Sequence, residues 1–445
     1  MAPRIFKTIK IVYSADMKMA DAEHFVIPTG NRFMIYVPRK GICALVNKEF
    51  IEKIKTKDKT VKALFNYIKA EKAVALLGSS TKPCFNMLTL FLTGDCNLRC
   101  SYCYASGGER PLWMDWDTAR TAIEHCIKNC RGDEFRLYFH GGGEPTLAFP
   151  MMKRCYNHAA ELCDAKGIKL KVGCGTNGIL NEEQINWMAS VNMRVAISMD
   201  GPPDIQNNQR PLKNGGPSYP IVRRTIERFN ALGMDYAVSC VFNKKCEGRM
   251  VEIIKHLNSL GVKEVGISPS YACGRCGATD VPDVTNFMTE YKKCFDVAEK
   301  AGMNLSAILK NSLSLGNTGC APSLIVTPDG YISSCYFVSN AKTPLSNIFM
   351  YGIVKNSKVL INQKKLNYLK SRTISRISGC QNCFCKWNCA GNCPYRAAIC
   401  NGTVFSPFKE SCLANQGLIK YLLERLLEGD IGMAGFDFVV HDIKI

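Results

Sequence analysis

Three cysteines lie close together in the segment TGDCNLRCSYCYASGG, which covers residues 93–108. Cys96, Cys100 and Cys103 follow the spacing C-x3-C-x2-C. A structural zinc site takes four ligands, whereas this loop supplies three. Three thiolates can instead hold a four-iron cluster and leave one iron open, so that another molecule can bind there and be activated. The spacing therefore indicates either an open iron–sulfur site or a zinc site that takes its fourth ligand from elsewhere.

Glycine-rich or polar motifs follow the next three predicted strands. HGGGEP covers residues 140–145, TNG covers 176–178 and SMDGP covers 198–202. Glycine lets a backbone approach a ligand closely, and Glu144 could accept a hydrogen bond from an ammonium group. Each motif alone is also compatible with a tight turn between a strand and a helix. Their repetition at successive strand ends indicates one shared site.

A sheet is needed to bring these motifs together. Apolar, strand-like runs begin at residue 86 and end at 271: NMLTLFLTG, FRLYFHGGGEP, KLKVGCGTNG, MRVAISMDGP, DYAVSCVFN and EVGISPSY. Amphipathic helical segments alternate with them, at 117–130, 150–166, 181–191, 218–232 and 247–260. This alternation predicts a parallel α/β sheet or barrel, whose site lies beyond the carboxyl ends of the strands. After about residue 305 the chain becomes rich in loops and cysteines, and then a helix is expected at 417–429.

The loop Cys96-x3-Cys100-x-Tyr102-Cys103 after the first strand resembles the radical S-adenosylmethionine (radical SAM) enzymes. The resemblance covers about residues 86–275 and implies a partial (β/α)6 barrel, with a [4Fe–4S] cluster on the three cysteines and SAM on the open iron. In that family one electron from the cluster cleaves SAM to a 5′-deoxyadenosyl radical, which abstracts a substrate hydrogen. Contacts with SAM are implied for Tyr102 (adenine), Gly142, Gly143 and Glu144 (amino group), Asn177, Ser198 and Asp200 (ribose and carboxylate) and Arg210 (carboxylate).

The C-terminal cysteines resemble the SPASM extension of radical SAM enzymes, which carries two auxiliary [4Fe–4S] clusters. The matching pattern is Cys320-x9-Gly330-x4-Cys335, then Cys380-x2-Cys383-x5-Cys389-x3-Cys393, then Cys412. It implies an outer cluster on Cys380, Cys383, Cys389 and Cys412 and an inner cluster on Cys320, Cys335 and Cys393. The inner cluster then lacks one ligand. Cys273 or Cys276 could supply it; alternatively, the fourth iron of this cluster stays open and could bind a substrate thiolate. A pair of zinc sites is the alternative for this region.

Residues 22–80 look like a small separate α+β module. Short strands are expected within residues 24–47, broken at 29–31 and 38–41, and helical stretches follow at 48–55 and 60–77. The module resembles an element that binds a leader peptide as an added strand, a way to grip an extended peptide; the alternative is a cap without that role. The predicted organisation is an N-terminal module (1–82), a radical SAM barrel (83–305) and a SPASM domain (306–445).

The composition narrows the class of protein. The 445 residues include 24 cysteines, which in a reducing cytosol indicate metal or redox chemistry rather than disulfides. No apolar run reaches about 18 residues and no signal peptide is evident, so we expect a cytoplasmic protein with no membrane partner. The formal net charge of +19 would suit nucleic acid, but the basic residues form no run of five and metal-bound thiolates would offset part of the charge. We therefore expect no nucleic acid; an acidic peptide would be attracted equally well.

Together with the resemblance, these features predict a peptide maturase that acts on a ribosomally made precursor peptide with a leader. It would form an intramolecular crosslink, most favourably a thioether and otherwise a carbon–carbon bond. SAM and three [4Fe–4S] clusters are the expected cofactors, with flavodoxin or ferredoxin as electron donor. One alternative is modification of a protein side chain, as in anaerobic sulfatase maturases. Those enzymes carry an aspartate base directly after the G-x4-C cysteine, where this chain has Tyr336, itself a candidate catalytic residue. The alternative of another class is a zinc-containing nucleic-acid-binding protein.

Overall fold

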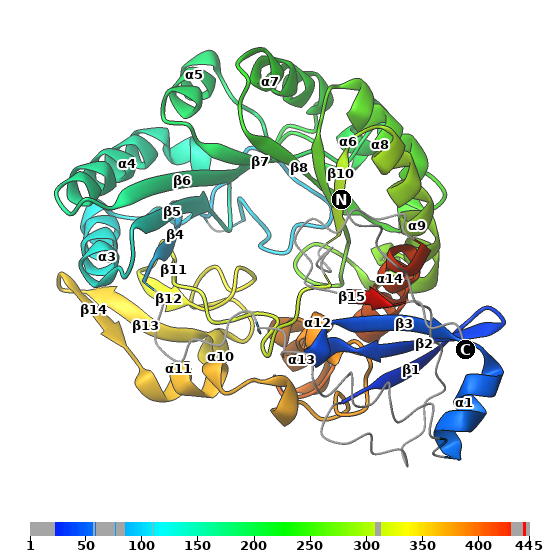
Figure 1. Ribbon diagram of the computed structural model, residues 1–445. Helices are drawn as coiled ribbons and strands as arrows, with labels where there is room; N and C mark the ends of the chain where they lie inside the picture. The colour runs from blue at the N-terminus through cyan, green and yellow to red at the C-terminus, as the bar shows by residue number, and fades with distance from the viewer. Residues whose placement is uncertain are drawn as a thin grey trace. The chain divides into compact units, whose positions relative to one another are not determined.

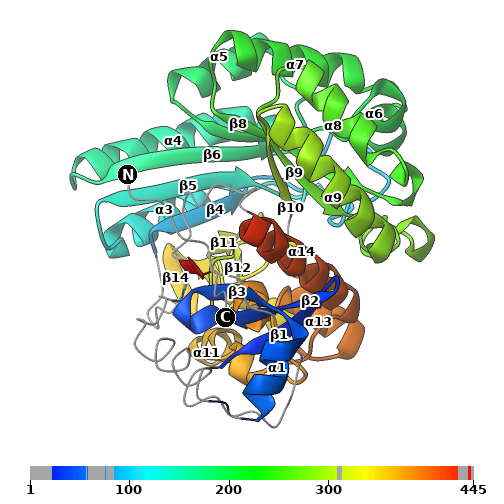
Figure 2. The same cartoon turned by 45° about the vertical axis from the view of Figure 1, so that its right-hand side comes forward.

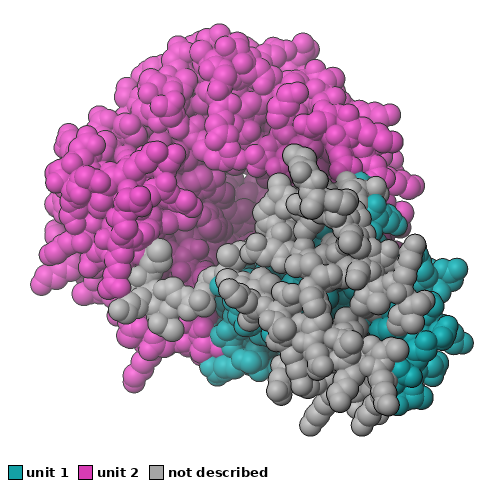
Figure 3. Space-filling model, viewed as in Figure 1, with its two compact units in different colours: residues 1–79, 309–320, 372–445 teal, residues 80–308, 321–371 magenta. Residues whose placement is uncertain are grey.

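The computed structural model describes residues 23–56, 58, 76, 85–109, 111–307, 313–428 and 439–441. The chain divides into two compact units, which Figure 3 colours separately. Unit 1 comprises residues 1–79, 309–320 and 372–445, and unit 2 comprises residues 80–308 and 321–371. The predicted domains 1–82, 83–305 and 306–445 stay a prediction, because compactness does not test which segments fold or act independently.

Unit 2 contains the predicted parallel sheet. Its six central strands are hydrogen-bonded in chain order: β4 (Met87–Phe91), β5 (Glu134–His140), β6 (Lys169–Thr176), β7 (Arg194–Ser198), β8 (Tyr236–Phe242) and β9 (Glu264–Pro269). Each pairs in parallel with the next, so all six predicted strands are confirmed. The predicted helices are confirmed as α3 (Trp116–Asn129), α4 (Phe149–Asp164), α5 (Glu182–Ser190), α7 (Tyr219–Ala231) and α8 (Met250–Ser259). They cover the outer side of the curved sheet (Figure 1), which is the predicted partial barrel.

The sheet of unit 2 continues beyond the barrel at both edges. At one edge β10 (Asn304–Ala307) joins β9 in parallel. At the other edge β11 (Ile325–Val326) pairs in parallel with β4, and an antiparallel ribbon follows: β12 (Tyr331–Ser333), β13 (Met350–Lys355) and β14 (Lys358–Ile361). Further helices of this unit are α6 (Pro203–Gln209), α9 (Val284–Lys300), α10 (Ser346–Phe349) and α11 (Gln363–Lys370). The sequence pattern did not predict β11–β14. β11, β12 and β14 have only two to four residues, too few to show a period, and the six-residue β13 was missed as well.

The two faces of the barrel strands differ because successive side chains point to opposite sides of a sheet. One set is fully buried on the side that the helices cover, including Leu88, Leu90, Leu137, Phe139, Cys174 and Ile197. The other set is short on β6–β9 and is partly or fully exposed on the concave side: Gly175, Ala196, Ser198, Ser239, Gly266 and Ser268. Figure 3 shows unit 2 hollowed, and short side chains on this face leave room there.

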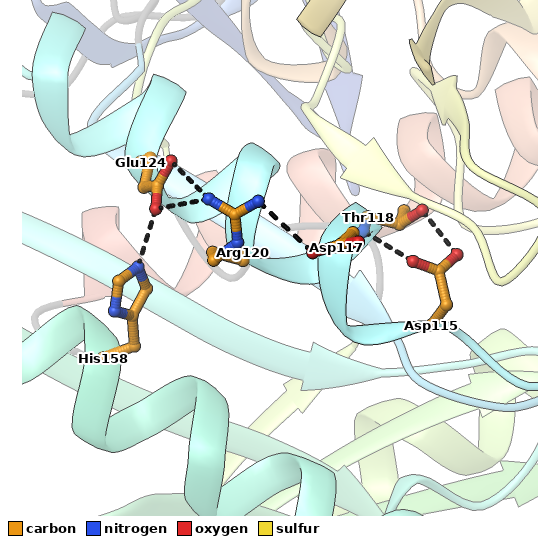
Figure 4. A network of polar contacts seen from close by, with 6 residues as sticks. All are labelled: Asp115, Asp117, Thr118, Arg120, Glu124 and His158. Atoms are coloured by element: carbon orange, nitrogen blue, oxygen red, sulfur yellow. Dashed lines mark hydrogen bonds and ion pairs between the residues drawn. The ribbon is translucent and has the colours of Figure 1, made fainter. Parts of the chain in front are cut away.

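Local sequence fixes where the helices of unit 2 begin. Asn181 and Gln184 form a capping box that satisfies backbone N–H groups at the start of α5. At the start of α3, Asp115 accepts hydrogen bonds from the backbone and the hydroxyl of Thr118, at 2.8 and 2.7 Å. Figure 4 shows how this network continues along α3 through Arg120 and Glu124 to His158 of α4. These contacts tie the first two barrel helices together.

Unit 1 contains an antiparallel sheet of β1 (Phe25–Thr29), β2 (Arg32–Val37) and β3 (Ile42–Val46), which confirms the predicted strands and their breaks. β15 (Val439–His441) joins β3 in parallel, and α1 (Lys48–Lys55) confirms the first predicted helix. The second predicted helix, 60–77, falls outside the described residues except for residue 76. The unit also contains α12 (Lys386–Cys389), α13 (Pro394–Asn401) and α14 (Lys409–Glu428), so the predicted C-terminal helix begins earlier than expected.

Both faces of this small sheet are covered at β2, where three successive side chains are buried. Met34, Ile35 and Tyr36 are fully buried, and the Tyr36 hydroxyl donates to Asn388 Oδ1 at 2.9 Å. α14 also contacts β3 (Figure 2). Among the described residues of the whole chain, no helix is long and apolar enough to cross a membrane.

Candidate functional site

The cysteine loop follows β4 in unit 2. Cys100 is buried, and Cys96 and Cys103 are half-buried. Backbone N–H groups point at two of the sulfur atoms: Leu98 donates to Cys96 Sγ at 3.5 Å and Gly107 donates to Cys103 Sγ at 3.4 Å. Hydrogen bonds to sulfur stabilise the thiolate form that binds metal. None of the described cysteines of the chain forms a disulfide, so the three thiols are available as ligands.

The surroundings of the loop raise the pKa values of its thiols. Burial and the nearby Glu144 carboxyl raise the pKa of Cys96 to about 12. Burial also raises the pKa of Cys100 to about 11, although the Arg210 charge opposes it. Repulsion among the three cysteines adds to both shifts, which shows that their sulfur atoms are neighbours. Thiols must lose their protons to bind metal, so this donor set fits a strongly cationic group such as an iron–sulfur core.

The glycine motif after β5 lies against the base of the cysteine loop. Gly143 N–H donates to Thr93 O at 3.1 Å, and Glu144 N–H donates to Asp95 O at 2.7 Å. A Cβ on Gly143 would lie 1.9 Å from Asp95 O. Only glycine therefore allows the two loops to pack this closely.

The Glu144 carboxylate connects three strand ends. Oε1 accepts from the Thr146 hydroxyl and from the Thr176 hydroxyl, at 2.7 and 2.8 Å, and Oε2 accepts from Asn177 N–H at 2.7 Å. Burial raises the pKa of Glu144, and these hydrogen bonds act in the opposite direction. All the donors are neutral, so a cationic partner at Oε2 would hold the carboxylate ionised. Asn177 also reaches the cysteine loop, with Nδ2 2.7 Å from Asn97 Oδ1 and 3.8 Å from Cys96 Sγ.

Asp200, Arg210 and Tyr102 form a buried network after β7. Asp200 Oδ2 accepts from Arg210 Nε at 2.9 Å and from the Tyr102 hydroxyl, while Oδ1 accepts from Val241 N–H at 2.9 Å. The Arg210 guanidinium lies 5.2 Å from the centre of the Tyr102 ring. Its two terminal nitrogens make no hydrogen bond with any described residue, and they stay available for an anion. Ser198 is the last residue of β7 and stands two positions before Asp200 in the chain. It is half-buried on the concave side of the sheet, where it adds a hydroxyl group.

Aromatic side chains line the barrel interior near β4 and β5. The Tyr336 hydroxyl is 3.0 Å from Thr89 Oγ1, and its ring packs edge-on against His140 at 4.9 Å between centroids. His140 lies over Gly175, where a Cβ would come within 2.7 Å of the imidazole. Its Nδ1 is enclosed without a hydrogen-bond partner among the described residues, and burial lowers the pKa of His140 to about 4. Sequence reasoning missed His140, although it stands directly before the glycine motif.

Arg275 supports the cysteine loop from the end of β9 and was also missed. Its Nε donates to Cys100 O at 2.9 Å, and its backbone N–H donates to Cys103 O at 3.0 Å. The next residue, Cys276, is buried, and its Sγ donates to Gly277 O at 3.7 Å, whereas Cys273 is half-buried. The segment YACGRCG could have indicated the role of Arg275, because it places a cationic side chain between two cysteines shortly after a strand ends.

The remaining predicted ligands lie in both units. Cys380, Cys383, Cys389 and Cys412 are in unit 1. Burial raises the pKa of Cys389 to about 12 and that of Cys412 to about 11, and repulsion from Cys380 and Cys383 contributes to both, so the four are neighbours. Cys385 lies with them, its Sγ 3.4 Å from Cys383 Sγ, and this hydrogen bond lowers the pKa of Cys383 to about 6. Of the predicted inner ligands, Cys320 and Cys393 belong to unit 1 and the buried Cys335 to unit 2.

In the described part of the chain no three His, Cys, Asp or Glu side chains converge closely enough to hold one metal ion. A four-iron cluster places its irons at four separate points, so its thiolates need not converge in this way.

Residues 90–257 match the model of the Radical SAM superfamily. The match includes the cysteine loop and the motifs after β5, β6 and β7, whose contacts are described above. This part of the chain is a radical SAM domain, a class that implies SAM and a [4Fe–4S] cluster as cofactors. Within the class it resembles the anaerobic sulfatase-maturating enzymes and the protein SuiB.

Two curated relatives illustrate the similarity. An uncharacterized protein of Methanocaldococcus jannaschii is 27% identical over 179 residues, which cover 40% of this chain and 60% of that protein, so the chain spans less than two thirds of this relative. The serine-type anaerobic sulfatase-maturating enzyme of Klebsiella aerogenes is 22% identical over 331 residues, which cover 70% of this chain and 80% of that enzyme.

Two solved structures share the fold. Native anSMEcpe with bound AdoMet superposes with a TM-score of 0.63 at 19% identity, covering 77% of this chain and 99% of that one. Streptococcus suis SuiB bound to the precursor peptide SuiA superposes with a TM-score of 0.54 at 13% identity, covering 86% of this chain and 98% of that one.

Proposed function

We propose that the chain is a radical SAM peptide maturase that crosslinks a ribosomally made precursor peptide, with a thioether as the favoured product and a carbon–carbon bond as the other. The [4Fe–4S] cluster and SAM would supply the radical that removes a hydrogen atom from the peptide. Two auxiliary clusters on the C-terminal cysteines would accept the electron released when the crosslink forms. Flavodoxin or ferredoxin is the proposed electron donor.

The residues of the barrel support this role through what each could bind. Cys96, Cys100 and Cys103 would hold the cluster. Glu144 has an oxygen atom with one neutral donor only, which suits the ammonium group of SAM. Arg210 is anchored through Nε alone, so its remaining N–H groups suit a carboxylate.

The observation that carries the proposal over sulfatase maturation is the contact between Tyr336 and Thr89. Tyr336 stands directly after Cys335, where the resemblance to sulfatase maturases calls for an aspartate base. Its hydroxyl contacts Thr89 Oγ1 and its ring packs against His140. The position therefore offers a phenol where those enzymes offer a carboxylate base.

The small sheet of unit 1 supports a peptide substrate. Among the described strands β1 pairs with β2 alone, so its other edge would suit an added strand. The SuiB structure with its precursor peptide SuiA shares this fold over most of the chain. A leader bound as a strand would present the following residues of the peptide for modification.

The test is anaerobic reaction of the reconstituted chain with SAM, a reductant and precursor peptides encoded beside its gene. We expect 5′-deoxyadenosine and a peptide that has lost two hydrogens, with the new bond located by tandem mass spectrometry. Formation of 5′-deoxyadenosine with no change in any such peptide would overturn the proposal.

A second candidate is modification of a protein side chain in the manner of the sulfatase-maturating relatives. It is favoured by the similarity to the Klebsiella aerogenes enzyme, which extends over 70% of this chain. The same assay with sulfatase-derived peptides distinguishes it, because its product keeps the peptide uncrosslinked.

A further inference from the structure

Arg372 is a buried cation without a carboxylate partner. It follows α11 in the chain, belongs to unit 1 and is 3% exposed. Its guanidinium donates only to backbone carbonyls, from Nε to Val404, from Nη1 to Asn392 at 3.0 Å and from Nη2 to Gly391. Among the described residues no Asp or Glu pairs with it. A buried charge is costly unless an opposite charge compensates it, so something other than a carboxylate must supply negative charge here.

Cysteines stand close in the chain to most of the groups that Arg372 contacts. The carbonyls of Gly391 and Asn392, to which it donates, lie in the chain between Cys389 and Cys393. The segment before Cys320 reaches the same place, because the Thr318 hydroxyl donates to Arg372 O at 2.6 Å.

The pKa of Arg372 also indicates that cysteines lie near its guanidinium. Burial lowers the pKa of Arg372, and the cysteines oppose this effect in the order Cys393, Cys320, Cys380 and Cys389. The guanidinium is therefore close to cysteines from both predicted auxiliary sets, and these thiolates are the available anions.

We propose that Arg372 is the counter-charge of the auxiliary iron–sulfur clusters. Its hydrogen bonds would fix the spacing between segments 317–320 and 389–393, and its charge would favour the reduced cluster beside it. A thiolate-bound [4Fe–4S] cluster becomes more negative by one charge on reduction, so a fixed cation nearby raises its potential. Arg372 is thus a positioning residue that helps the clusters accept an electron, whatever the substrate.

The test is a redox titration followed by electron paramagnetic resonance. The full chain with Cys96→Ala, Cys100→Ala and Cys103→Ala would retain only the auxiliary clusters. In this background Arg372→Gln removes the charge and keeps an amide donor. We expect iron to bind and the electron affinity of one auxiliary cluster to fall roughly tenfold, which is a shift of about 59 mV to more negative potential.

Two further variants make the result decisive. Arg376→Gln removes an exposed guanidinium of the same unit, which stacks on Phe405 at 4.7 Å, and should leave the potentials unchanged. Arg372→Lys keeps the charge and should restore iron content and potential even where Arg372→Gln binds little iron. Unchanged potentials in Arg372→Gln, or failure of Arg372→Lys to restore them, would overturn the proposal. Neither readout depends on a peptide substrate, so failure of the maturase proposal is a separate result.

Discussion

Asp200 and Arg210 form a buried ion pair in unit 2, with Asp200 Oδ2 2.9 Å from Arg210 Nε. The Asp200 side chain is completely buried, and that of Arg210 is 8% exposed. The same carboxylate binds the hydroxyl of Tyr102 from the cysteine loop and the backbone of β8. One carboxylate therefore fixes the loop, the arginine and a barrel strand.

Asp200→Asn should destabilise the fold strongly. The amide keeps the shape but leaves the Arg210 charge buried and uncompensated, which typically costs about 3–5 kcal/mol. Chemical denaturation of the purified chain measures this loss. Asp204→Asn is the matched control, because Asp204 pairs with Arg249 at the surface, where a pair contributes about 0–1 kcal/mol. Equal losses in the two variants would contradict the expectation.

Residues whose roles depend on chain neighbours could be predicted from the sequence. The barrel strands show clear apolar runs, and most of them run into Gly, Asn, Asp or Pro, so both the fold and the cysteine loop were accessible. The contacts of Glu144 with Thr176 and Asn177 followed the same logic, because adjacent parallel strands bring their carboxyl ends together.

Residues that act across long chain separations could not be predicted. Tyr336 meets Thr89 across 247 positions and Arg275 binds Cys100 across 175. Arg372 gives no signal either, since its partners are backbone carbonyls, which every residue possesses. Only the folded chain shows that the carbonyls near this arginine are next to cysteines.

Gly143→Ala should abolish SAM binding. A Cβ at this position would lie 1.9 Å from Asp95 O, a backbone atom that cannot move aside without displacing the cysteine loop. Equilibrium dialysis with SAM on the reconstituted chain measures the loss. Gly277→Ala is the control, because its nearest atom would be 3.5 Å away. Retained SAM affinity in Gly143→Ala would show that the two loops are not packed as described.

Cys96→Ala should abolish SAM cleavage, whereas Cys412→Ala should leave some cleavage without crosslinking. The first would remove a ligand of the proposed radical-generating cluster, and the second a ligand of the proposed outer auxiliary cluster. Iron analysis should give about twelve irons per chain for the parent, from three four-iron clusters, and fewer in each variant. Full crosslinking by Cys412→Ala would refute the auxiliary role, and zinc in place of iron would favour the zinc alternative.

Cys273→Ala should lower the iron content more than Cys276→Ala. A ligand thiol must lose its proton and reach the metal. Burial raises the pKa of Cys276, whose Sγ is already directed at Gly277 O, whereas Cys273 is half-buried. Iron analysis and electron paramagnetic resonance of both variants test this choice. Equal, full iron content in both would favour an open iron at the inner cluster.

His140→Gln should make the free energy of unfolding of the chain less dependent on pH. The folded chain holds the pKa of His140 at about 4, against an ordinary value of 6.5, because burial disfavours the charged imidazole. Between these values the unfolded chain binds more protons, so stability is complete above about pH 6.5 and falls as the pH is lowered towards 4. From pH 7.5 to 5.5 this loss is on the order of 1 kcal/mol, and the variant should lack it.

Thermal or chemical denaturation at both pH values measures the difference. Burial also lowers the pKa of His125 on α3, so His125→Gln is a comparison variant that should leave the contribution of His140 in place. A parent and a His140→Gln variant with parallel pH profiles would show that the imidazole is not enclosed in this way.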